Sequence, residues 1–524
     1  MDILDPSRMR EADRITIEEL KVPGLLLMEN AGRAVAEAVV RTVDDAGDRI
    51  VLVFAGPGHN GGDGFVAARH LARLGVACEV LLIGARHTAL KGDPRTMADA
   101  WVGLGGSLIE IPDLATWERT DTELGPDALV IDAIYGTGLA RPLDGLAAAA
   151  VDAINESGAW VLAVDVPSGV DAGHSQPIGP CVHADVTVTF ARPKPAHLLP
   201  PVEVLSGELI VVDIGIPPRA VAATKPDLHW ADESLIAGLV PGRTPLDHKG
   251  DFGHLLVVAG SVGKAGAAAI TGWSALQSGA GLVTVATPGP ARAEVALFAP
   301  ELMTEPLPFS DDGELERGAS LVAMELLDTR DVLALGPGLG QGETIGLEIR
   351  ALVAESDRPI VLDADGLNAF AGDLAALATR RSSLVVTPHP GEAARLLSCS
   401  PSEVQADRLL AARRIARDAD AVCVLKGFRT IVAAPDGQAL VNSTGNPGMA
   451  TAGMGDALTG LIAGFMAQGL EPFAAASLAV YLHGLAGDIA VEEEETHATL
   501  STTALLRHLP AALRRLTNED LDEP

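Results

Sequence analysis

The stretch Asn446-Pro447-Gly448-Met449-Ala450-Thr451-Ala452-Gly453-Met454-Gly455-Asp456 joins a tight glycine-rich turn to one acidic side chain. Asp456 stands where an apolar helical pattern over 457–470 begins. Such a turn lets backbone N–H groups converge on an anion, and the positive end of the helix dipole strengthens the attraction. A carboxylate beside a bound phosphate can take a proton from an attacking hydroxyl. A plain glycine-rich helix start is the alternative, but the ten small or turn-forming residues before Asp456 favour an anion-binding turn.

A second glycine-rich turn, Gly56-Pro57-Gly58-His59-Asn60-Gly61-Gly62-Asp63-Gly64, lies between an apolar run at 50–54 and a helical pattern. A strand, a glycine turn and a helix in this order form a phosphate-binding arrangement. The turn also matches G-x-G-x-x-G, and an NAD dehydrogenase would then carry an acid about 20 residues later, at the end of the next strand. That strand, predicted over 77–83, is followed by Gly84-Ala85 and has Glu79 inside it. We therefore exclude a standard NAD dehydrogenase.

Composition limits the classes of protein and partner. A chain of 524 residues is too long for one ordinary domain. Its net charge of −32 argues against nucleic acid or an anionic membrane as partner. A bound nucleotide must then be held by local N–H groups, helix dipoles and metal ions. Of only seven lysines, four lie in or beside glycine-rich turns: Lys194, Lys249, Lys264 and Lys426.

Other features indicate a soluble, cytoplasmic protein. The four cysteines form no C-x-x-C pair, so neither a disulfide framework nor a zinc site is expected. The first residues lack the basic and apolar regions of a signal peptide. Apolar, uncharged stretches such as 457–470 are too short for a membrane span.

Short apolar runs alternate with helical patterns along the chain, which predicts parallel sheets covered by helices on both faces. The predicted strands are 50–54, 77–83, 128–134, 160–164, 186–190 and 209–214, then 255–259, 282–286, 332–335, 360–363, 384–387, 422–425 and 430–434. Polar and glycine-rich turns follow many of them, at the edge where such sheets bind ligands. Proline-rich residues 217–226 break the pattern and are predicted to be a linker. We expect two α/β domains, over 1–220 and 228–517.

The order and spacing of these turns resemble the bifunctional NAD(P)H-hydrate repair enzymes, which fuse a YjeF-type epimerase domain to a ribokinase-like dehydratase domain. N-terminal motifs that carry the resemblance are Met28-Glu29-Asn30-Ala31-Gly32, the turn at 58–64, Asp132-Ala133-Ile134-Tyr135-Gly136-Thr137-Gly138, Val164-Asp165-Val166-Pro167-Ser168-Gly169 and Asp213-Ile214-Gly215-Ile216-Pro217. C-terminal motifs are His248-Lys249-Gly250-Asp251-Phe252-Gly253, the turns at 260–267 and 336–340, Asp363-Ala364-Asp365, Thr387-Pro388-His389-Pro390-Gly391-Glu392, Lys426-Gly427 and 445–456. The resemblance implies a Rossmann-like doubly wound domain followed by a ribokinase-like α/β domain.

Two positions depart from the family pattern. The usual Asn-Asn-Gly-Gly-Asp reads His59-Asn60-Gly61-Gly62-Asp63, and the usual Gly-Thr-Gly-Asp reads Gly453-Met454-Gly455-Asp456. The second change removes a hydroxyl but keeps both glycines and the carboxylate.

In the N-terminal domain the resemblance implies interconversion of the R and S hydrates of NADH and NADPH. Asp165, which ends a predicted strand, is assigned the proton transfer as the C–OH bond breaks and re-forms; the alternative is that it only caps the turn at 167–169. The family's potassium site would map onto Asn60, Asp132 and Ser168. Substrate would contact Asp165 and two segments: His59, Asn60, Gly61, Gly62 and Asp63, then Gly136, Thr137, Gly138, Leu139, Ala140, Arg141 and Pro142.

In the C-terminal domain the resemblance implies ADP-dependent dehydration of the S hydrate, with AMP and phosphate released. Phosphorylation makes the hydroxyl a good leaving group, and Asp456 would deprotonate or orient it. The hydrate pocket would include Ala267, Gly338, His389 and Asp456; His389, between two prolines, could instead only pack a turn. Nucleotide-binding residues would be Lys426, Gly427, Phe428, Arg429, Thr430, Asn446, Gly448, Met449, Ala450, Thr451, Ala452, Gly453, Met454 and Gly455. Mg²⁺ is expected from phosphoryl transfer in general, although no carboxylate cage is visible in the sequence.

Two other functions are considered. YjeF-type domains also occur in non-catalytic scaffolds of RNA decapping, but Asn60, Asp132, Asp165 and Ser168 are all present, and the charge opposes RNA binding. The second is a ribokinase-like kinase of a vitamin alcohol with a non-catalytic N-terminal scaffold domain. The expected partners are the NADH and NADPH hydrates and ADP, with no nucleic acid and no membrane, in a homo-oligomer.

Overall fold

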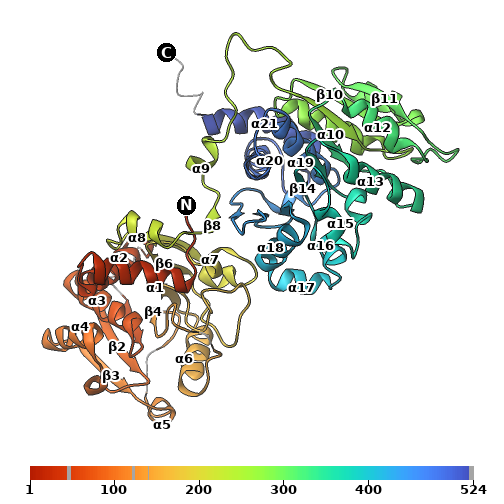
Figure 1. Cartoon of the computed structure of the whole chain (residues 1–524). Coiled ribbons are helices and arrows are strands. Elements are labelled where there is room, and N and C mark those ends of the chain that lie inside the picture. The colour runs from red at the N-terminus through yellow and green to blue at the C-terminus, as the bar shows by residue number, and fades with distance from the viewer. Residues whose placement is uncertain (44–45, 47–48, 121–123, 140, 518–524) are drawn as a thin grey trace. The chain divides into compact units, whose positions relative to one another are not determined.

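The computed structural model describes residues 1–524 except 44–45, 47–48, 121–123, 140 and 518–524. The chain divides into an N-terminal unit over Asp2–Asp227 and a C-terminal unit that comprises Met1 and the residues from Leu228 onward (Figure 1). Each unit has its own sheet and its own hydrophobic core.

The N-terminal unit is built on a parallel sheet, as the alternating pattern predicts. Its strands are β1 Ile50–Ala55, β2 Ala77–Ile83, β3 Ser107–Ile111, β4 Leu129–Ala133, β5 Trp160–Val164, β6 Val186–Phe190 and β7 Glu208–Val212. They lie in the order β3-β2-β1-β4-β5-β6-β7, and the direction of winding reverses between β1 and β4. A ligand site is expected there, beyond the carboxyl ends of the strands. The sequence did not predict β3, an edge strand with Glu110 in a partly exposed run.

Helices cover both faces of this sheet (Figure 1). They are α1 Pro6–Arg14 with a π-helical turn Ile15–Glu19, α2 Gly24–Thr42, α3 His59–Arg73, α4 Gly92–Gly103, α5 Leu114–Trp117, α6 Gly145–Glu156, α7 Pro195–Leu198 and α8 Pro218–Ala223. One core lies against α2 and α3 and includes Val35 and Phe65; the other lies against α6 and includes Phe54 and Val151. Aliphatic residues dominate both cores.

Helix α3 begins earlier than the sequence predicted. The segment His59–Gly64, predicted as part of a glycine loop, forms the first turns of the helix after the N-cap Gly58. Its glycines allow close packing: a Cβ atom at Gly61 would lie 1.9 Å from the Gly56 carbonyl oxygen, and one at Gly64 would lie 2.8 Å from the Cβ of Ala133. The helix can therefore start against the sheet edge, with its N-terminal N–H groups beside the site.

The proline-rich segment 217–226 is not the linker that its composition predicted. Residues 218–223 form α8, in which Ala220 and Val221 are 0% and 1% exposed. Proline at the first position of a helix already has a helical φ angle, so here it starts a helix and does not form an extended spacer. This segment therefore belongs to the folded N-terminal unit.

The C-terminal unit has a mixed sheet whose main part is parallel. Its strands are β8 Leu228–Trp230, β9 His254–Val258, β10 Leu282–Pro288, β11 Met303–Leu307, β12 Val332–Leu335, β13 Ile360–Leu362, β14 Leu384–Val386, β15 Val422–Leu425, β16 Ile431–Ala433 and β17 Ala439–Val441. Their order is β11-β10-β9-β12-β13-β14-β15-β16-β17-β8, with antiparallel pairs only around β16 in the described part of the chain. The sequence missed β8 and β17, which have three residues each, and β11, an edge strand that contains Pro306.

Its helices are α9 Glu233–Ala237, α10 Ala265–Gln277, α11 Arg292–Phe298, α12 Ala319–Leu327, α13 Glu343–Glu355, α14 Asp365–Asn368, α15 Leu374–Ala378, α16 Pro390–Leu397, α17 Pro401–Ala406, α18 Arg408–Ala419, α19 Met454–Ala467, α20 Pro472–Glu493 and α21 Thr502–Thr517. Helices α10, α19, α20 and α21 gather on one face of the sheet and pack a large aliphatic core (Figure 1). Together with the N-terminal sheet, this arrangement confirms the predicted α/β fold class.

Helix α20 corrects one expectation. By length and composition alone it could cross a membrane, whereas we expected no apolar stretch long enough to do so. In the fold, 83% of its most apolar window is buried inside the protein, as in the core helix of a globular domain. Asp488 in this helix accepts hydrogen bonds from the Gly445 N–H and the Asn446 side-chain amide. This carboxylate therefore helps to hold the glycine-rich turn before α19.

We predict that the two units fold when produced separately. A fragment of residues 1–227 should give a cooperative thermal transition, because it keeps α8 and the whole first core. A fragment of residues 1–219 should melt lower, since it loses the buried Ala220 and Val221. The C-terminal fragment must start by Leu228, because β8 pairs with β17. Circular dichroism melts in which 1–227 and 228–524 show no transition would contradict the division.

Candidate functional site

A cavity of about 660 Å³ opens at the carboxyl ends of β1, β4 and β5 in the N-terminal unit. Predicted substrate residues that line it are His59, Asn60, Asp63, Gly136, Thr137, Gly138, Leu139 and Asp165. Gly61 and Gly62 lie in the packed start of α3 instead, where a Cβ atom at Gly62 would lie 2.7 Å from Met28. Arg141 and Pro142 are exposed and do not line the cavity, and Ala140 lies outside the described residues.

Three of the predicted residues meet at one point of the cavity wall. A Cβ atom built on Gly136 would lie 2.9 Å from Oδ1 of Asn60 and 3.4 Å from Oδ2 of Asp165. The first turn of α3, the loop after β4 and the end of β5 therefore converge. This is the edge at which the sequence placed the site.

Asp165 is held by a buried lysine. Nζ of Lys194 lies 2.6 Å from Oδ1 of Asp165, and the hydroxyl of Thr189 donates to the same oxygen at 3.1 Å. Burial opposes the charge of Asp165, but the Lys194 ammonium and its hydrogen bond outweigh burial and hold the pKa of this carboxyl below its ordinary value. The backbone of Asp165 has φ +65°, a left-handed conformation that is uncommon for a residue other than glycine.

The turn at 167–169 is capped by a different acid. Asp132 accepts hydrogen bonds from the Ser168 backbone N–H at 2.7 Å and from the Ser168 hydroxyl at 2.6 Å. Among the described residues, Asp165 makes no hydrogen bond to this turn. The capping role considered as the alternative for Asp165 therefore falls to Asp132.

Of the three residues predicted to hold potassium, Asn60 lines the cavity, whereas Asp132 and Ser168 lie behind its wall. Asp132 and Ser168 are both 0% exposed, and burial raises the pKa of Asp132 to about 6 despite three hydrogen bonds from Ser168 and Ile134. No described cationic side chain pairs with Asp132. The buried amide of Asn60 leaves Nδ2 without a partner. Asp132 and Ser168 provide a buried carboxylate beside a hydroxyl, and Asn60 carries an amide oxygen; these oxygen ligands suit a hard cation, so the residues fit the group.

Sequence reasoning missed four polar residues around this cavity: Asp13, Tyr135, Lys194 and His197. Asp13 comes from α1, and burial raises its pKa to about 6. The signal for Lys194 was present, because few lysines exist and this one stands in a proline turn. Nothing in the local pattern of α1 marks Asp13 as a site residue.

In the C-terminal unit the turn before α19 has the geometry of an anion site. Gly453, the N-cap, has φ +87°, which lets the chain reverse into the helix. The Thr502 hydroxyl donates to the Ala452 carbonyl at 2.8 Å, which leaves this carbonyl paired and helps to fix the turn. None of the N–H groups of residues 452–455 donates to an acceptor within the described chain, and they remain available to a ligand.

Asp456 lies beside a buried ion pair. Nζ of Lys426 is 2.7 Å from Oδ1 of Asp363, whose Oδ2 accepts from the Thr459 hydroxyl at 2.8 Å. A Cβ atom at Gly455 would lie 3.3 Å from the same Nζ. Burial and the charge of Asp363 raise the pKa of Asp456 to about 7, against the opposing effect of Lys426. A carboxyl that titrates near neutral pH is suited to accept a proton from an alcohol.

The predicted hydrate-pocket residues fall into two groups. Ala267 and Gly338 are neighbours, because a Cβ atom at Gly338 would lie 3.0 Å from that of Ala267. His389 is the N-cap of α16, where its Nδ1 accepts from the Gly391 N–H at 2.9 Å and Glu392 closes a capping box. Its turn also receives a hydrogen bond from the Lys426 N–H to the Pro388 carbonyl. His389 thus has the structural role considered for it, with its ring half exposed beside the turn.

A cavity of about 450 Å³ lies next to the glycine turn. Predicted nucleotide residues that line it are Lys426, Gly427, Phe428, Arg429, Thr430, Asn446, Met449, Ala450, Met454 and Gly455. Gly448, Thr451, Ala452 and Gly453 belong to the same turn but do not line this cavity. The sequence missed its inner wall, formed by Leu458, Val480 and the buried His483. No group of three or more His, Cys, Asp or Glu suited to a metal exists among the described residues.

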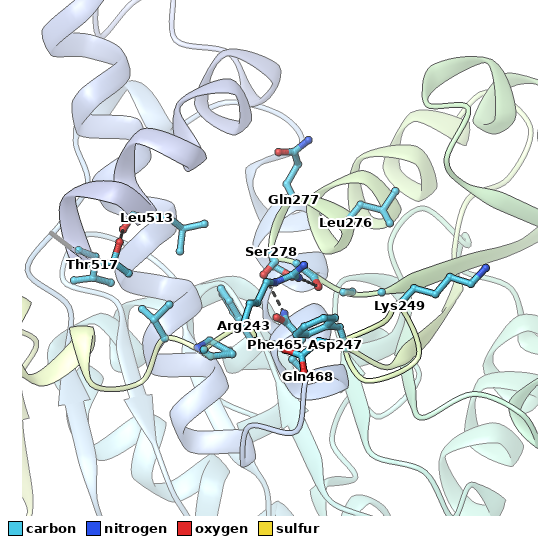
Figure 2. Close-up of a pocket in the computed structure, with 18 of the residues that line it drawn as sticks. Arg243, Asp247, Lys249, Leu276, Gln277, Ser278, Phe465, Gln468, Leu513 and Thr517 are labelled. Atoms are coloured by element: carbon cyan, nitrogen blue, oxygen red, sulfur yellow. Dashed lines mark hydrogen bonds between the residues drawn. The ribbon is translucent and has the colours of Figure 1, made fainter. Parts of the chain in front are cut away.

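Another cavity, of about 1000 Å³, lies elsewhere in the C-terminal unit, where α10 and α19 end (Figure 2). Arg243 is hydrogen-bonded to the Gly279 carbonyl and stacks on Phe252, and Lys249 extends away from the cavity (Figure 2). Helix carboxyl ends disfavour anions. This cavity therefore lacks the free N–H donors of the site at the opposite ends of these helices, although Arg243, His248 and Lys249 are among its lining residues.

The chain is similar to known proteins over almost its whole length. The family model described as "YjeF-related protein N-terminus" matches residues 24–196, and the one described as "NAD(P)H-hydrate dehydratase" matches residues 255–511. The bifunctional NAD(P)H-hydrate repair enzyme of Moorella thermoacetica is 42% identical over 520 residues, which is 99% of this chain and 98% of the relative. The enzyme of the same name from Escherichia coli K12 is 35% identical and covers 98% of this chain and 94% of its own.

Solved structures match the C-terminal part. The ADP/ATP-dependent NAD(P)H-hydrate dehydratase of Bacillus subtilis, co-crystallised with ATP and Mg²⁺, is 31% identical with a TM-score of 0.47 and covers 55% of this chain and 98% of its own. A ribokinase-like superfamily protein from Enterococcus faecalis is 25% identical with a TM-score of 0.48 and covers 55% of this chain and 96% of its own.

The raised pKa of Asp456 predicts a pH-dependent cost in stability. Between about pH 4 and pH 7 the folded chain holds a proton at Asp456 that the unfolded chain has released, so the free energy of unfolding falls as pH rises through this window. Asp456→Asn should remove that fall. Its C-terminal unit should melt higher than wild type above pH 7 and equally below about pH 4 in calorimetry. The exposed Asp311→Asn is the control, and a pH-independent difference for Asp456→Asn would refute the assignment.

Proposed function

The chain belongs to the bifunctional NAD(P)H-hydrate repair enzymes, and we propose that its N-terminal unit interconverts the R and S hydrates of NADH and NADPH while its C-terminal unit dehydrates the S hydrate with ADP. Full-length similarity to relatives with this name supports the proposal. The single observation that carries it is the presence of two separate sheet-edge sites, one with an ionised aspartate and one with an aspartate that titrates near neutral pH.

Epimerisation requires the ring C–OH bond to break and re-form on the other face. The ring nitrogen lone pair expels the hydroxyl, which leaves as water once it has taken a proton; water then adds to the opposite face and loses a proton. Asp165 is suited to carry that proton, because its Oδ2 faces the cavity while Oδ1 is held by Lys194. A positioned acid–base group of this kind contributes about 10²–10⁴-fold in rate.

Potassium is proposed at Asn60, Asp132 and Ser168. The ion would compensate the buried charge of Asp132 and so hold the Ser168 turn against the loop after β4. Support comes from the buried carboxylate without a cationic partner among the described residues. The ion has no chemical step of its own in this proposal.

Dehydration is harder because hydroxide is a poor leaving group. Asp456 would take the hydroxyl proton while the oxygen attacks the terminal phosphorus of ADP and AMP departs. The N–H groups of residues 452–455 and the Lys426 ammonium would stabilise the transferring phosphoryl group. The ring nitrogen lone pair then expels phosphate, and loss of a proton from the adjacent ring carbon restores the double bond. Mg²⁺ would arrive with the nucleotide phosphates, since the described chain offers no metal cage.

We further propose a cytoplasmic location and a homo-oligomer. A net charge of −32 supports the absence of nucleic acid or anionic membrane partners.

The test of the function is to incubate the protein with mixed R and S hydrates of NADH and with ADP, ATP or no nucleotide, and to follow NADH by absorbance. Recovery of both epimers only with nucleotide supports the proposal. No recovery with either nucleotide would remove it.

Substitutions in the two units should impair different steps of the repair reaction. Asp456→Asn should abolish nucleotide-dependent recovery of NADH but leave R/S interconversion intact, because its side chain lies only in the second site. Asp165→Asn should repair the S half at the wild-type rate and then stall on the R half, with epimerisation slowed about 10²–10⁴-fold. A single-phase recovery by Asp165→Asn at the wild-type rate would exclude Asp165 from the mechanism.

Asp132→Asn should behave differently from Asp165→Asn. If Asp132 holds a cation, its neutral variant should bind the hydrate more weakly and be partly rescued by raised potassium. The measurement is the epimerisation rate against substrate concentration in potassium chloride, with choline chloride at equal ionic strength as the control. Equal rates in the two salts for wild type would argue against a potassium site.

A further inference from the structure

We propose that Lys194 is a positioning residue for epimerisation: its buried ammonium group holds Asp165 as a carboxylate with one oxygen fixed and the other presented to the substrate. This inference deepens the proposed function of the N-terminal unit and rests on the role of Asp165 in it.

The contacts of Lys194 are all internal. Its Nζ lies 2.6 Å from Oδ1 of Asp165, 2.8 Å from the Thr189 hydroxyl and 3.2 Å from the Phe190 carbonyl. These three acceptors match the three donors of an ammonium group. The side chain is 1% exposed although it forms part of the cavity wall. Lys194 therefore has no donor left for a substrate phosphate and acts through Asp165.

The backbone on both sides of the pair is held in place. Asp165 and Ala191 both have left-handed φ values, +65° and +59°. The Lys194 N–H donates to Nδ1 of His197 at 3.0 Å. Burial, helped by the Lys194 charge, lowers the pKa of His197 to about 3, so its ring stays neutral and Nδ1 stays an acceptor. A strained backbone that its surroundings maintain in this way is typical of functional sites.

The two oxygens of Asp165 have different roles as a result. Oδ1 accepts from Lys194 and Thr189. Oδ2 has no hydrogen-bond partner among the described residues and faces Gly136, at the edge of the predicted substrate loop. A proton leaving the substrate is therefore accepted at Oδ2.

Other charged groups around the pair make the lysine necessary. Asp13 from α1 and Asp63 from α3 line the same cavity, as does the exposed Arg10, and His197 lies behind the pair. Burial raises the pKa of Asp63 and of Asp13, and the Asp165 charge raises both further. Without Lys194, three carboxyls at or near this wall would have no cationic partner among the described buried residues, and the pKa of Asp165 would rise.

The test measures the R-to-S epimerisation rate of the full chain against pH for Lys194→Met and Lys194→Gln. Removal of a charge this close should move the acid limb of the profile upward by about 1–3 pH units, with activity returning at higher pH. Lys194→Gln removes the charge but keeps an N–H donor at this position, so it serves if Lys194→Met does not fold. The exposed Lys91→Met, which removes one charge at the surface, should leave the profile unchanged.

Two results would overturn the inference. One is a wild-type acid limb in a folded Lys194 variant; the other is a loss of rate that is equal at all pH values, which indicates a merely structural role. Asp165→Asn separates this inference from the proposed function. If that variant epimerises normally, the proposed role of Asp165 fails; if it is inactive while the Lys194 variants keep the wild-type profile, only the role of Lys194 fails.

Discussion

Each site depends on a lysine buried against an aspartate at the carboxyl end of a strand. Burial of either charge alone would be costly, so the ion pair fixes both side chains and the loops that carry them. In the N-terminal unit the proposed proton carrier, Asp165, is itself a member of the pair with Lys194. In the C-terminal unit Lys426 pairs with Asp363, and Asp456 remains outside the pair. The same interaction therefore leaves one aspartate ionised and lets the other titrate near neutral pH.

Close backbone packing brings the rest of each site to these pairs. Gly61 lets α3 start directly against the end of β1, and Gly453 lets the chain turn into α19. In both cases the first turn of a helix lies at the edge where the parallel strands end. Donor N–H groups and carboxylates thus come from segments that are far apart in sequence but share one sheet edge.

Much of this arrangement could be predicted from the sequence, because it is encoded locally. Runs such as 50–54 and 332–335 are buried on both faces and read as strands, and glycine turns mark the strand ends. The motifs around Asp165 and Asp456 carried the family resemblance. What local patterns cannot show is which distant side chains become partners. Asp13 reaches the cavity from α1, and His483 reaches the nucleotide cavity from α20. The helix at 218–223 was missed because its prolines, read as spacers, preset the first turn instead.

The ion pairing of both site lysines has a consequence for how substrates arrive. Dinucleotides and nucleotides are polyanions, and the chain they approach carries a net charge of −32. Because Lys194 and Lys426 are already paired inside the fold, they contribute little to the long-range field that an approaching ligand meets. Encounter is therefore opposed by repulsion at low ionic strength and eased by salt, in contrast to proteins that collect nucleotides on a basic surface. Recognition then depends on short-range contacts such as those of the backbone N–H groups at residues 452–455.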